Sequence, residues 1–288
     1  MALAAKIPFR HPYAAGFPGL GSQAVPTDAD ALDYLDRMAA ADGASVEVGV
    51  ATAVDAFFRG LKSTGQEYDG VYRTTFESLK ACCILAGART LAGALVPVVG
   101  DAPTNVADGF VEGDYSRTAG LTGDGSTTYL DSGRANDDDL QDDNHLAVYI
   151  TEAVSSNEVF AGVISTTNFC ARQLNWRSTN NVRGFANSIS YLQSAIYSGS
   201  ASLVGVSRAN GTQQSLRVDG TTTTGDVDSA DLPQENVYIF ARNDDDVATS
   251  LSDATLAFYS IGTDIGSDGL ADLDTAVTNL ITAIGEAL

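Results

Sequence analysis

The chain has 288 residues and a formal net charge of −21 at pH 7, because it carries 37 acidic side chains and only 16 Lys and Arg. This charge excludes a general nucleic-acid binder, since phosphate neutralisation requires clustered Lys and Arg, and it disfavours anionic membrane surfaces for the same reason. Apolar residues make up 44% of the chain, which allows a sizeable core, yet no apolar run reaches the roughly 18 residues of a membrane span. We therefore expect neither nucleic-acid nor membrane partners.

The first 26 residues are expected to form an extended N-terminal arm. Three prolines oppose regular helix or sheet pairing in this segment: Pro8, Pro12 and Pro18. The arm carries Lys6 and Arg10, and no acidic residue precedes Asp28. In a strongly acidic chain, such a segment is suited to docking on another protein.

Residues 27–100 are expected to form a small helical unit. Apolar residues recur at helical spacing over 31–39, 46–61 and 72–95, and Asp28 gives a capping signal before the first of these segments. Three short helices are therefore predicted, the last of them ending at Pro97.

From residue 101 to residue 265, the hydrophobic period changes from 3.6 to 2. Six segments alternate or run apolar over strand length, namely 145–150, 159–165, 203–208, 214–218, 237–242 and 256–261. Asn210-Gly211 and Asp219-Gly220 stand at hairpin positions, where both pairs allow positive φ. Consecutive strands without intervening helices predict an antiparallel two-sheet sandwich or jelly roll.

Residues 266–288 are predicted to form an amphipathic C-terminal helix. Its apolar stripe follows steps of 4, 3 and 4 residues and consists of Leu273, Val277, Leu280 and Ile284. The sequence leaves two interpretations of this stripe: a helix packed on its own sandwich, or an intersubunit bundle, as in a homotrimer.

Patterns of known catalytic chemistry are missing from the chain. His11 and His145 are the only histidines, no G-x-S-x-G elbow is present, and Cys170 has no base near it in sequence. No strand carries the alternating acids of a sandwich glucanase. We therefore expect no catalytic residues and no enzymatic activity; the alternative is a glycan depolymerase that uses acids from two different loops.

An acidic segment at 136–144 supplies carboxylate and amide oxygens that are suited to Ca²⁺. The candidate ligands are Asp137, Asp138, Asp139, Asp142 and Asp143. Their spacing is not diagnostic, so the alternative is a solvated charged turn. No other cofactor is expected.

The best candidate ligand edge surrounds the single tryptophan, Trp176. An aromatic ring that stacks on a sugar would be joined there by amide and guanidinium groups from Arg172, Asn175, Arg177 and Asn180. The alternative is that Trp176 fills the core of the sandwich.

Four stretches resemble a family of tailed-bacteriophage virion proteins that carry a concanavalin A-like (laminin G-like) β-sandwich: 120–131, 134–144, 145–149 and 256–262. The resemblance covers about residues 27 to 288. It implies a mainly β fold with some α structure, in which a concanavalin A-like jelly roll follows the helical unit and precedes the C-terminal helix. It brings no catalytic or ligand residues with it.

Together, the residues and the resemblance predict a protein on the outer surface of a virion. The arm would attach it to other capsid or tail proteins, and the sandwich would face outward as a capsid decoration, head fibre or tail fibre that adheres to host glycan. A purely structural capsid cement protein is an alternative.

Overall fold

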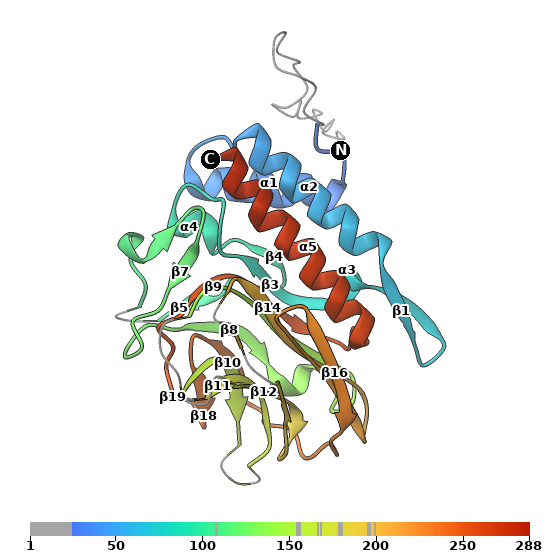
Figure 1. The fold of residues 1–288 in the computed structure, drawn as a ribbon. Helices are drawn as coiled ribbons and strands as arrows, with labels where there is room; N and C mark the ends of the chain where they lie inside the picture. The colour runs from blue at the N-terminus through green and yellow to red at the C-terminus, as the bar shows by residue number, and fades with distance from the viewer. Residues whose placement is uncertain are drawn as a thin grey trace, which may run out of the picture.

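The computed structural model describes residues 25–288 except 107–108, 154–156, 166, 168, 178–180, 195–196 and 199. These residues form three layers: helices, an inner sheet beneath them, and an outer sheet beneath the inner one (Figure 1). Apart from its last two residues, the arm predicted over 1–26 lies outside the described residues. Within the described part of the chain, no helix is long and apolar enough to cross a membrane.

The helical layer consists of α1 (Ala29–Asp42), α2 (Val48–Ser63) and α5 (Gly266–Ala287). As the sequence predicts, the carboxylate of Asp28 caps α1 by accepting hydrogen bonds from the backbone of Asp30 and Ala31. α1 ends at Gly43, whose φ of 63° closes the helix. The two helices predicted over 31–39 and 46–61 are confirmed.

The central strands of the inner sheet are buried on both faces. Its main path runs through β16 (Thr221–Asp226), β15 (Gln213–Val218), β14 (Ser202–Asn210), β9 (Asn144–Glu152), β20 (Thr255–Gly262), β3 (Leu79–Ile84) and β4 (Pro97–Val99). β7 (Gly120–Thr122) also pairs with β20, and β6 (Tyr115–Ser116) pairs with β7. In β9, Ala147 and Tyr149 face the helices, whereas Leu146 and Val148 face the outer sheet. This double burial explains the nearly continuous apolar runs of these strands.

The outer sheet completes the sandwich. Its path runs through β13 (Leu192–Gln193), β12 (Asn181–Ser188), β11 (Ala171–Arg177), β10 (Glu158–Ile164), β17 (Asn236–Ile239), β8 (Leu130–Ala135) and β5 (Thr104–Asn105). β18 (Arg242–Asp244) pairs parallel with β10 and antiparallel with β19 (Val247–Thr249). The other pairs are antiparallel, so the predicted fold class, an antiparallel β-sandwich with a C-terminal helix, is confirmed.

Short elements connect these layers. They are β1 (Gly65–Tyr68), β2 (Val71–Thr74), α3 (Thr75–Ser78), α4 (Leu91–Ala94), η2 (Glu112–Asp114) and η3 (Asn136–Asp138). β1 and β2 form a separate hairpin that projects beside α5 (Figure 1).

Two fully buried arginines join the sheets through backbone carbonyls. Arg172 of β11 donates to the carbonyl oxygens of His145 and Gly262 in the inner sheet. Arg208 of β14 donates to the carbonyl oxygen of Ala186 in the outer sheet at 2.6 Å. These bonds give buried backbone carbonyl groups a charged donor from the opposite sheet.

The helix predicted over 72–95 is wrong. Residues 79–84 form β3, which pairs with β20 in the middle of the inner sheet. A strand covered on both faces has apolar residues at every position, so its run also matches a helical period. The boundary predicted at residue 100 consequently fails as well, because β3 belongs to the same sheet as the strands that follow it.

The intersubunit interpretation of the C-terminal stripe is also wrong. α5 is a helix as predicted, but its stripe residues are 0–2% exposed within the chain: Leu273, Val277, Leu280 and Ile284. They pack in one cluster with α2 and with apolar residues of the inner sheet. The helix-facing side of this sheet must be removed from water, and α5 does so in place of a neighbouring subunit.

Candidate functional site

The outer sheet has one broad face on which the structure describes no further layer. The inner sheet lies between the helices and the outer sheet, so neither of its faces is open. The outer sheet uses one face against the inner sheet, and its second face points away from the rest of the molecule (Figure 1). We call this second face the outer face.

β11 divides its side chains between the core and the outer face. Leu174 and Trp176 belong to the core cluster between the two sheets. Because successive side chains of a strand point to opposite sides, Gln173 and Asn175 lie on the outer face. Along the strand, these two residues are about 6.6 Å apart.

β12 and the loop after it complete a polar and aromatic surface. Phe185 pairs directly with Gln173, and Arg183 pairs with Asn175, so the four side chains share one face. The ring of Tyr191 lies 5.3 Å from that of Phe185, and the guanidinium carbon of Arg183 lies 4.2 Å from the centroid of the Tyr191 ring. We call these five residues the β11–β12 patch.

The two amides of the patch are buried and incompletely bonded. Gln173 is 4% exposed and Asn175 is 8% exposed. Their oxygens, Oε1 of Gln173 and Oδ1 of Asn175, accept no hydrogen bond from the described residues. Buried polar atoms almost always have a partner, and these two oxygens at neighbouring positions of one face could each accept a further hydrogen bond.

The chemistry of the patch suits a polyhydroxylated ligand. A primary amide both donates and accepts hydrogen bonds, as a sugar hydroxyl does, and two amides at this spacing can contact different hydroxyls of one ring. The aromatic pair offers an apolar face with a polar phenol at its edge. Apolar walls with a few directional polar groups are typical of small-molecule sites.

The residues predicted for glycan binding are only partly brought together. Asn175 lies in the patch, but Trp176 is 7% exposed and packs edge-on against Tyr197 inside the sandwich, at 5.6 Å. Arg172 is fully buried between the sheets. The structure therefore contradicts a ligand role for Trp176 and Arg172, and shows the core-filling alternative.

Two further predicted ligands cannot be placed. Arg177 ends β11, but its side chain lies outside the described residues, and so does Asn180. Four residues of the patch were not among the predicted ligands: Gln173, Arg183, Phe185 and Tyr191. The alternation Gln-Leu-Asn-Trp over 173–176 contained the signal, because it assigns the amides and the apolar residues to opposite faces.

The structure contradicts the calcium site predicted at 136–144. Asp139 binds Arg134 and Arg172, and Asp143 binds both terminal nitrogens of Arg73 at 2.9 Å. Asp137 and Asp138 are exposed on η3, where Asp138 lies 3.9 Å from Arg134, and Asp142 is partly buried. Within the described part of the chain, no cluster of three or more His, Cys, Asp or Glu side chains suits a metal ion. Arginine side chains, and not a calcium ion, neutralise Asp139 and Asp143.

Burial shifts the pKa values of the ion pair between Arg172 and Asp139. Arg172 and Asp139 have fully buried side chains, with Nη1 of Arg172 2.9 Å from Oδ2 of Asp139. Burial alone would raise the pKa of Asp139, but Arg172 and Arg134 hold that pKa below its ordinary value. Burial also lowers the pKa of Arg172. The pair is a structural part of the sandwich and is closed to ligands.

Burial also shifts the pKa values of three other side chains. Burial lowers the pKa of His145 to about 4, and its ring nitrogens lie near Thr263 O and Ser260 Oγ. Burial raises the pKa of Cys170 to about 12, which makes it a poor nucleophile at neutral pH. Burial also raises the pKa of Glu158 to about 7.

The two sheets and their strand order define a predominantly antiparallel β-sandwich. Among solved structures, the chain is similar to the CBM40 domain of a Ruminococcus gnavus IT-sialidase bound to α2,3-sialyllactose, with a TM-score of 0.36, 15% identity, and coverage of 47% of this chain and 83% of that one. It is also similar to Trypanosoma rangeli sialidase in complex with sialic acid, with a TM-score of 0.48 and 12% identity; the match covers 81% of this chain and 39% of the sialidase. No protein-family model and no curated protein matches the chain.

The comparison corrects the expectation that the chain is not an enzyme. The solved structures to which the chain is similar include Trypanosoma rangeli sialidase and a mutant of it displaying trans-sialidase activity, which are enzymes. With identities of 11–16%, the likeness assigns neither a substrate nor catalytic residues to this chain.

Proposed function

We propose that the protein binds a glycan through the β11–β12 patch. The observation that carries the proposal is the pair of buried amides, Gln173 and Asn175, whose oxygens accept no hydrogen bond from the described part of the chain. A sugar hydroxyl that donates to either oxygen would satisfy it. The aromatic pair beside the amides supports the same ligand class, because a ring face and hydroxyl-binding groups stand next to each other.

The layer order supports this location. The outer face is remote from the helical layer, so a glycan held there would not compete with packing on α1, α2 or α5. Substitutions in the patch should also leave the two apolar clusters intact, because its five side chains belong to neither cluster. Binding can therefore be tested separately from folding.

Replacement of Asn175 by Ala is expected to weaken glycan binding about tenfold, because a hydrogen bond to a buried polar group contributes roughly 0.5–1.5 kcal/mol. A glycan array would first identify the ligand, and calorimetric titration would then compare the dissociation constants of the wild type, Asn175→Ala and Gln173→Ala. Release of reducing ends, measured in the same samples, would separate binding from cleavage.

The matched control is Thr223→Ala, an exposed substitution on edge strand β16 of the other sheet. It should leave the affinity unchanged. The proposal fails if no glycan binds the wild type, or if Asn175→Ala and Gln173→Ala bind as the wild type does while melting at its temperature.

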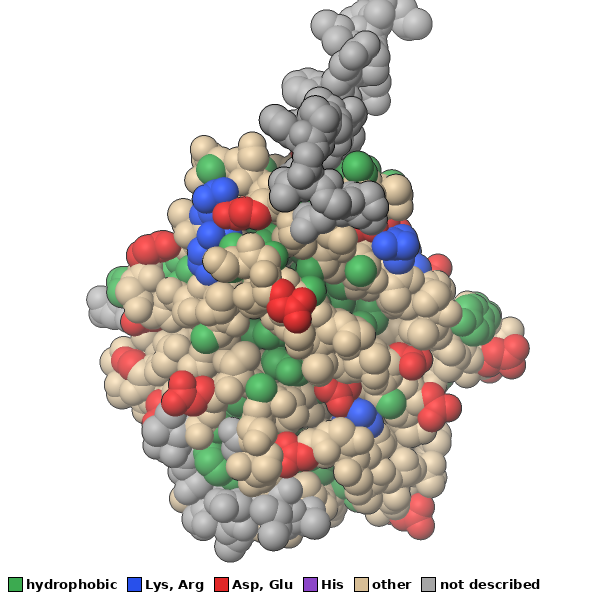
Figure 2. All heavy atoms as spheres, turned by 45° about the horizontal axis from the view of Figure 1, so that its top comes forward, with side chains coloured by type: hydrophobic (Ala, Val, Ile, Leu, Met, Phe, Trp, Pro, Cys, Tyr) green, Lys and Arg blue, Asp and Glu red, His purple; other side chains and the backbone are tan. Residues whose placement is uncertain are grey.

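We also propose that the sandwich is displayed on the outer surface of a bacteriophage particle. This setting depends on the resemblance of the sequence to virion proteins. The dispersed carboxylates of the surface support it, because a repelling negative exterior keeps particles apart (Figure 2). Antibodies raised against the purified chain should label intact particles in electron micrographs; labelling of disrupted particles only would contradict the proposal.

A further inference from the structure

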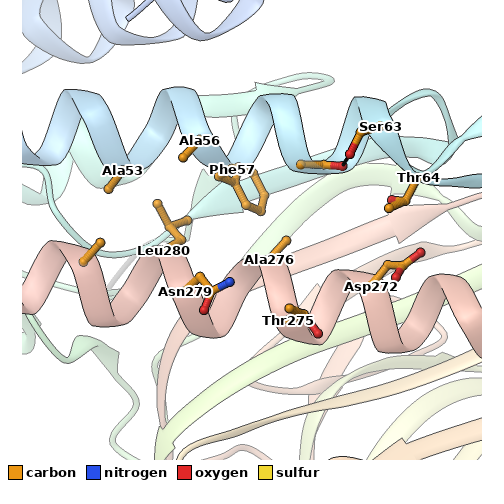
Figure 3. A pocket seen from close by; sticks show the side chains of 12 residues that line it. Ala53, Ala56, Phe57, Ser63, Thr64, Asp272, Thr275, Ala276, Asn279 and Leu280 are labelled. Atoms are coloured by element: carbon orange, nitrogen blue, oxygen red, sulfur yellow. Dashed lines mark hydrogen bonds between the residues drawn. The ribbon is translucent and has the colours of Figure 1, made fainter. Parts of the chain in front are cut away.

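An apolar groove of about 340 Å³ runs between α2 and α5 on the side of the helical layer away from the inner sheet. Its α2 wall consists of Ala53, Ala56, Phe57 and Gly60, and its α5 wall of Thr275, Ala276, Asn279, Leu280 and Ala283 (Figure 3). Ser63, Thr64 and Asp272 lie at one end. The groove is separate from the β11–β12 patch.

The groove exists because many of the facing residues are small. Beyond the groove, a Cβ on Gly49 would lie only 2.6 Å from the Cβ of Ala287, so the helices touch there. Along the groove, the short side chains of Ala53, Ala56 and Ala276 and the bare backbone of Gly60 leave space between the helices. Phe57 and Leu280 form the floor and are each 2% exposed. Apolar walls of this kind favour an apolar occupant, at about 25 cal/mol for each Å² removed from water.

The first described residues of the chain lie against α2, the helix that forms one wall of this groove. Val25 is 54% exposed, and the backbone N–H groups of Thr27 and Asp28 each donate to Asp55 of α2 at 2.7 Å. Lys62, at the end of α2, also binds the Asp28 carboxylate. Residues 1–24 therefore start one helix width from the groove, and eight extended residues already span about 26 Å.

The composition of residues 1–24 complements the groove in shape and charge. Its prolines favour an extended chain, which fits between two helices. It offers apolar side chains at several positions, including Phe9, Tyr13 and Phe17. It carries Lys6 and Arg10 and no acid, whereas the remaining residues hold 14 basic and 37 acidic side chains, for a net charge of −23. Asp272 brings one of these negative charges to one end of the groove.

We propose that residues 1–24 fold back and occupy the α2–α5 groove of the same chain. The segment would cover the exposed apolar walls of α2 and α5. Its short tether to α2 makes the contact intramolecular, with an effective concentration of about millimolar or more. The groove would thus compete for the arm with any other virion protein that the arm contacts.

Disulfide trapping in the full-length chain tests this placement. The native thiols do not interfere, because Cys82, Cys83 and Cys170 are fully buried. Phe9, Tyr13 and Phe17 would each be changed to Cys in combination with Ala276→Cys in the groove. The matched control combines each arm cysteine with Val247→Cys, which is 60% exposed and lies beyond the outer sheet.

We expect at least one arm cysteine to form an intramolecular disulfide with position 276 about tenfold faster than with position 247. Mass spectrometry of the non-reduced chain identifies the bridge and its intramolecular origin. Equal rates at positions 276 and 247 for all three arm cysteines would overturn the proposal. Bridges that form only between two chains would overturn it as well.

A groove-filling substitution supplies an independent readout. Ala56 is exposed on the groove wall, so Ala56→Phe should fold while blocking the occupant. Chymotrypsin should then cleave after Phe9 or Tyr13 about tenfold faster than in the wild type, because the segment is released. Val247→Phe should leave the cleavage rate unchanged. Unaltered cleavage of an Ala56→Phe chain that melts normally would contradict the occupied groove.

Discussion

Replacement of Arg172 by Met is expected to lower the free energy of unfolding by about 3–5 kcal/mol. The substitution leaves the Asp139 carboxylate buried and without its 2.9 Å partner, and it removes the donors that bind the carbonyl oxygens of His145 and Gly262. Charge burial and lost inter-sheet hydrogen bonds therefore act in the same direction. Urea unfolding, followed by circular dichroism, measures the change.

Arg134→Met is the matched control, because Arg134 binds the same carboxylate from a partly exposed position. Arg172 still neutralises Asp139 in this variant, so the loss should stay near 1 kcal/mol. A difference between the two variants isolates the buried part of the network. Equal losses would contradict the inter-sheet role of Arg172.

Replacement of Glu158 by Gln is expected to stabilise the protein by about 3 kcal/mol above pH 7. Burial raises the pKa of Glu158 from 4.5 to about 7, with a smaller contribution from the charge of Asp253. The folded chain therefore retains a proton that the unfolded chain releases, and wild-type stability falls as pH rises from about 4.5 to 7. Gln keeps an oxygen for the Ser252 hydroxyl and the Asp253 N–H, and it cannot ionise.

The pH dependence of the stability of Glu158→Gln should reveal the titration of a second buried group, His145. The pKa of buried His145 falls from 6.5 to about 4, so its contribution to stability is lost as pH falls through that window, which is opposite in sign to that of Glu158. The two largely cancel between pH 4.5 and 6.5 in the wild type. Glu158→Gln should therefore gain stability with pH there, at up to about 1.4 kcal/mol per unit.

Melting temperatures measured by calorimetry from pH 4 to pH 8 check this expectation. The control is Glu152→Gln at an exposed position near the end of β9, which should leave the profile unchanged. Parallel profiles for the wild type and Glu158→Gln would show that the carboxyl group titrates alike in the folded and unfolded chains.

The predictable parts of the fold are those with a local signal. The Asp28 cap, the Asp219-Gly220 turn and the period-2 strands follow from adjacent residues, and the structure has φ values of 48° at Asp219 and 72° at Gly220. β3 was missed because burial on both faces erases the alternation that marks a strand. Its place beside β20 depends on residues about 175 positions away, which no local pattern contains.

The site was harder to predict because residue type does not fix the direction of a side chain. Trp176 and Asn175 are adjacent in sequence and lie on opposite faces. The acidic segment at 136–144 has the composition of a cation site, but arginines distant in sequence, Arg73 and Arg172, reach it in the folded chain. Long-range partners of this kind become visible only when the sheets are assembled.

The alternation of β11 has a consequence for how the protein can change. Arg172, Leu174 and Trp176 lie between the two sheets, whereas Gln173 and Asn175 lie on the opposite side of the strand and outside the apolar core. A saturation library of this strand should therefore show greater tolerance of polar residues of similar size at positions 173 and 175 than at positions 172, 174 and 176. Variation at those two positions would alter the proposed ligand preference while the scaffold persists.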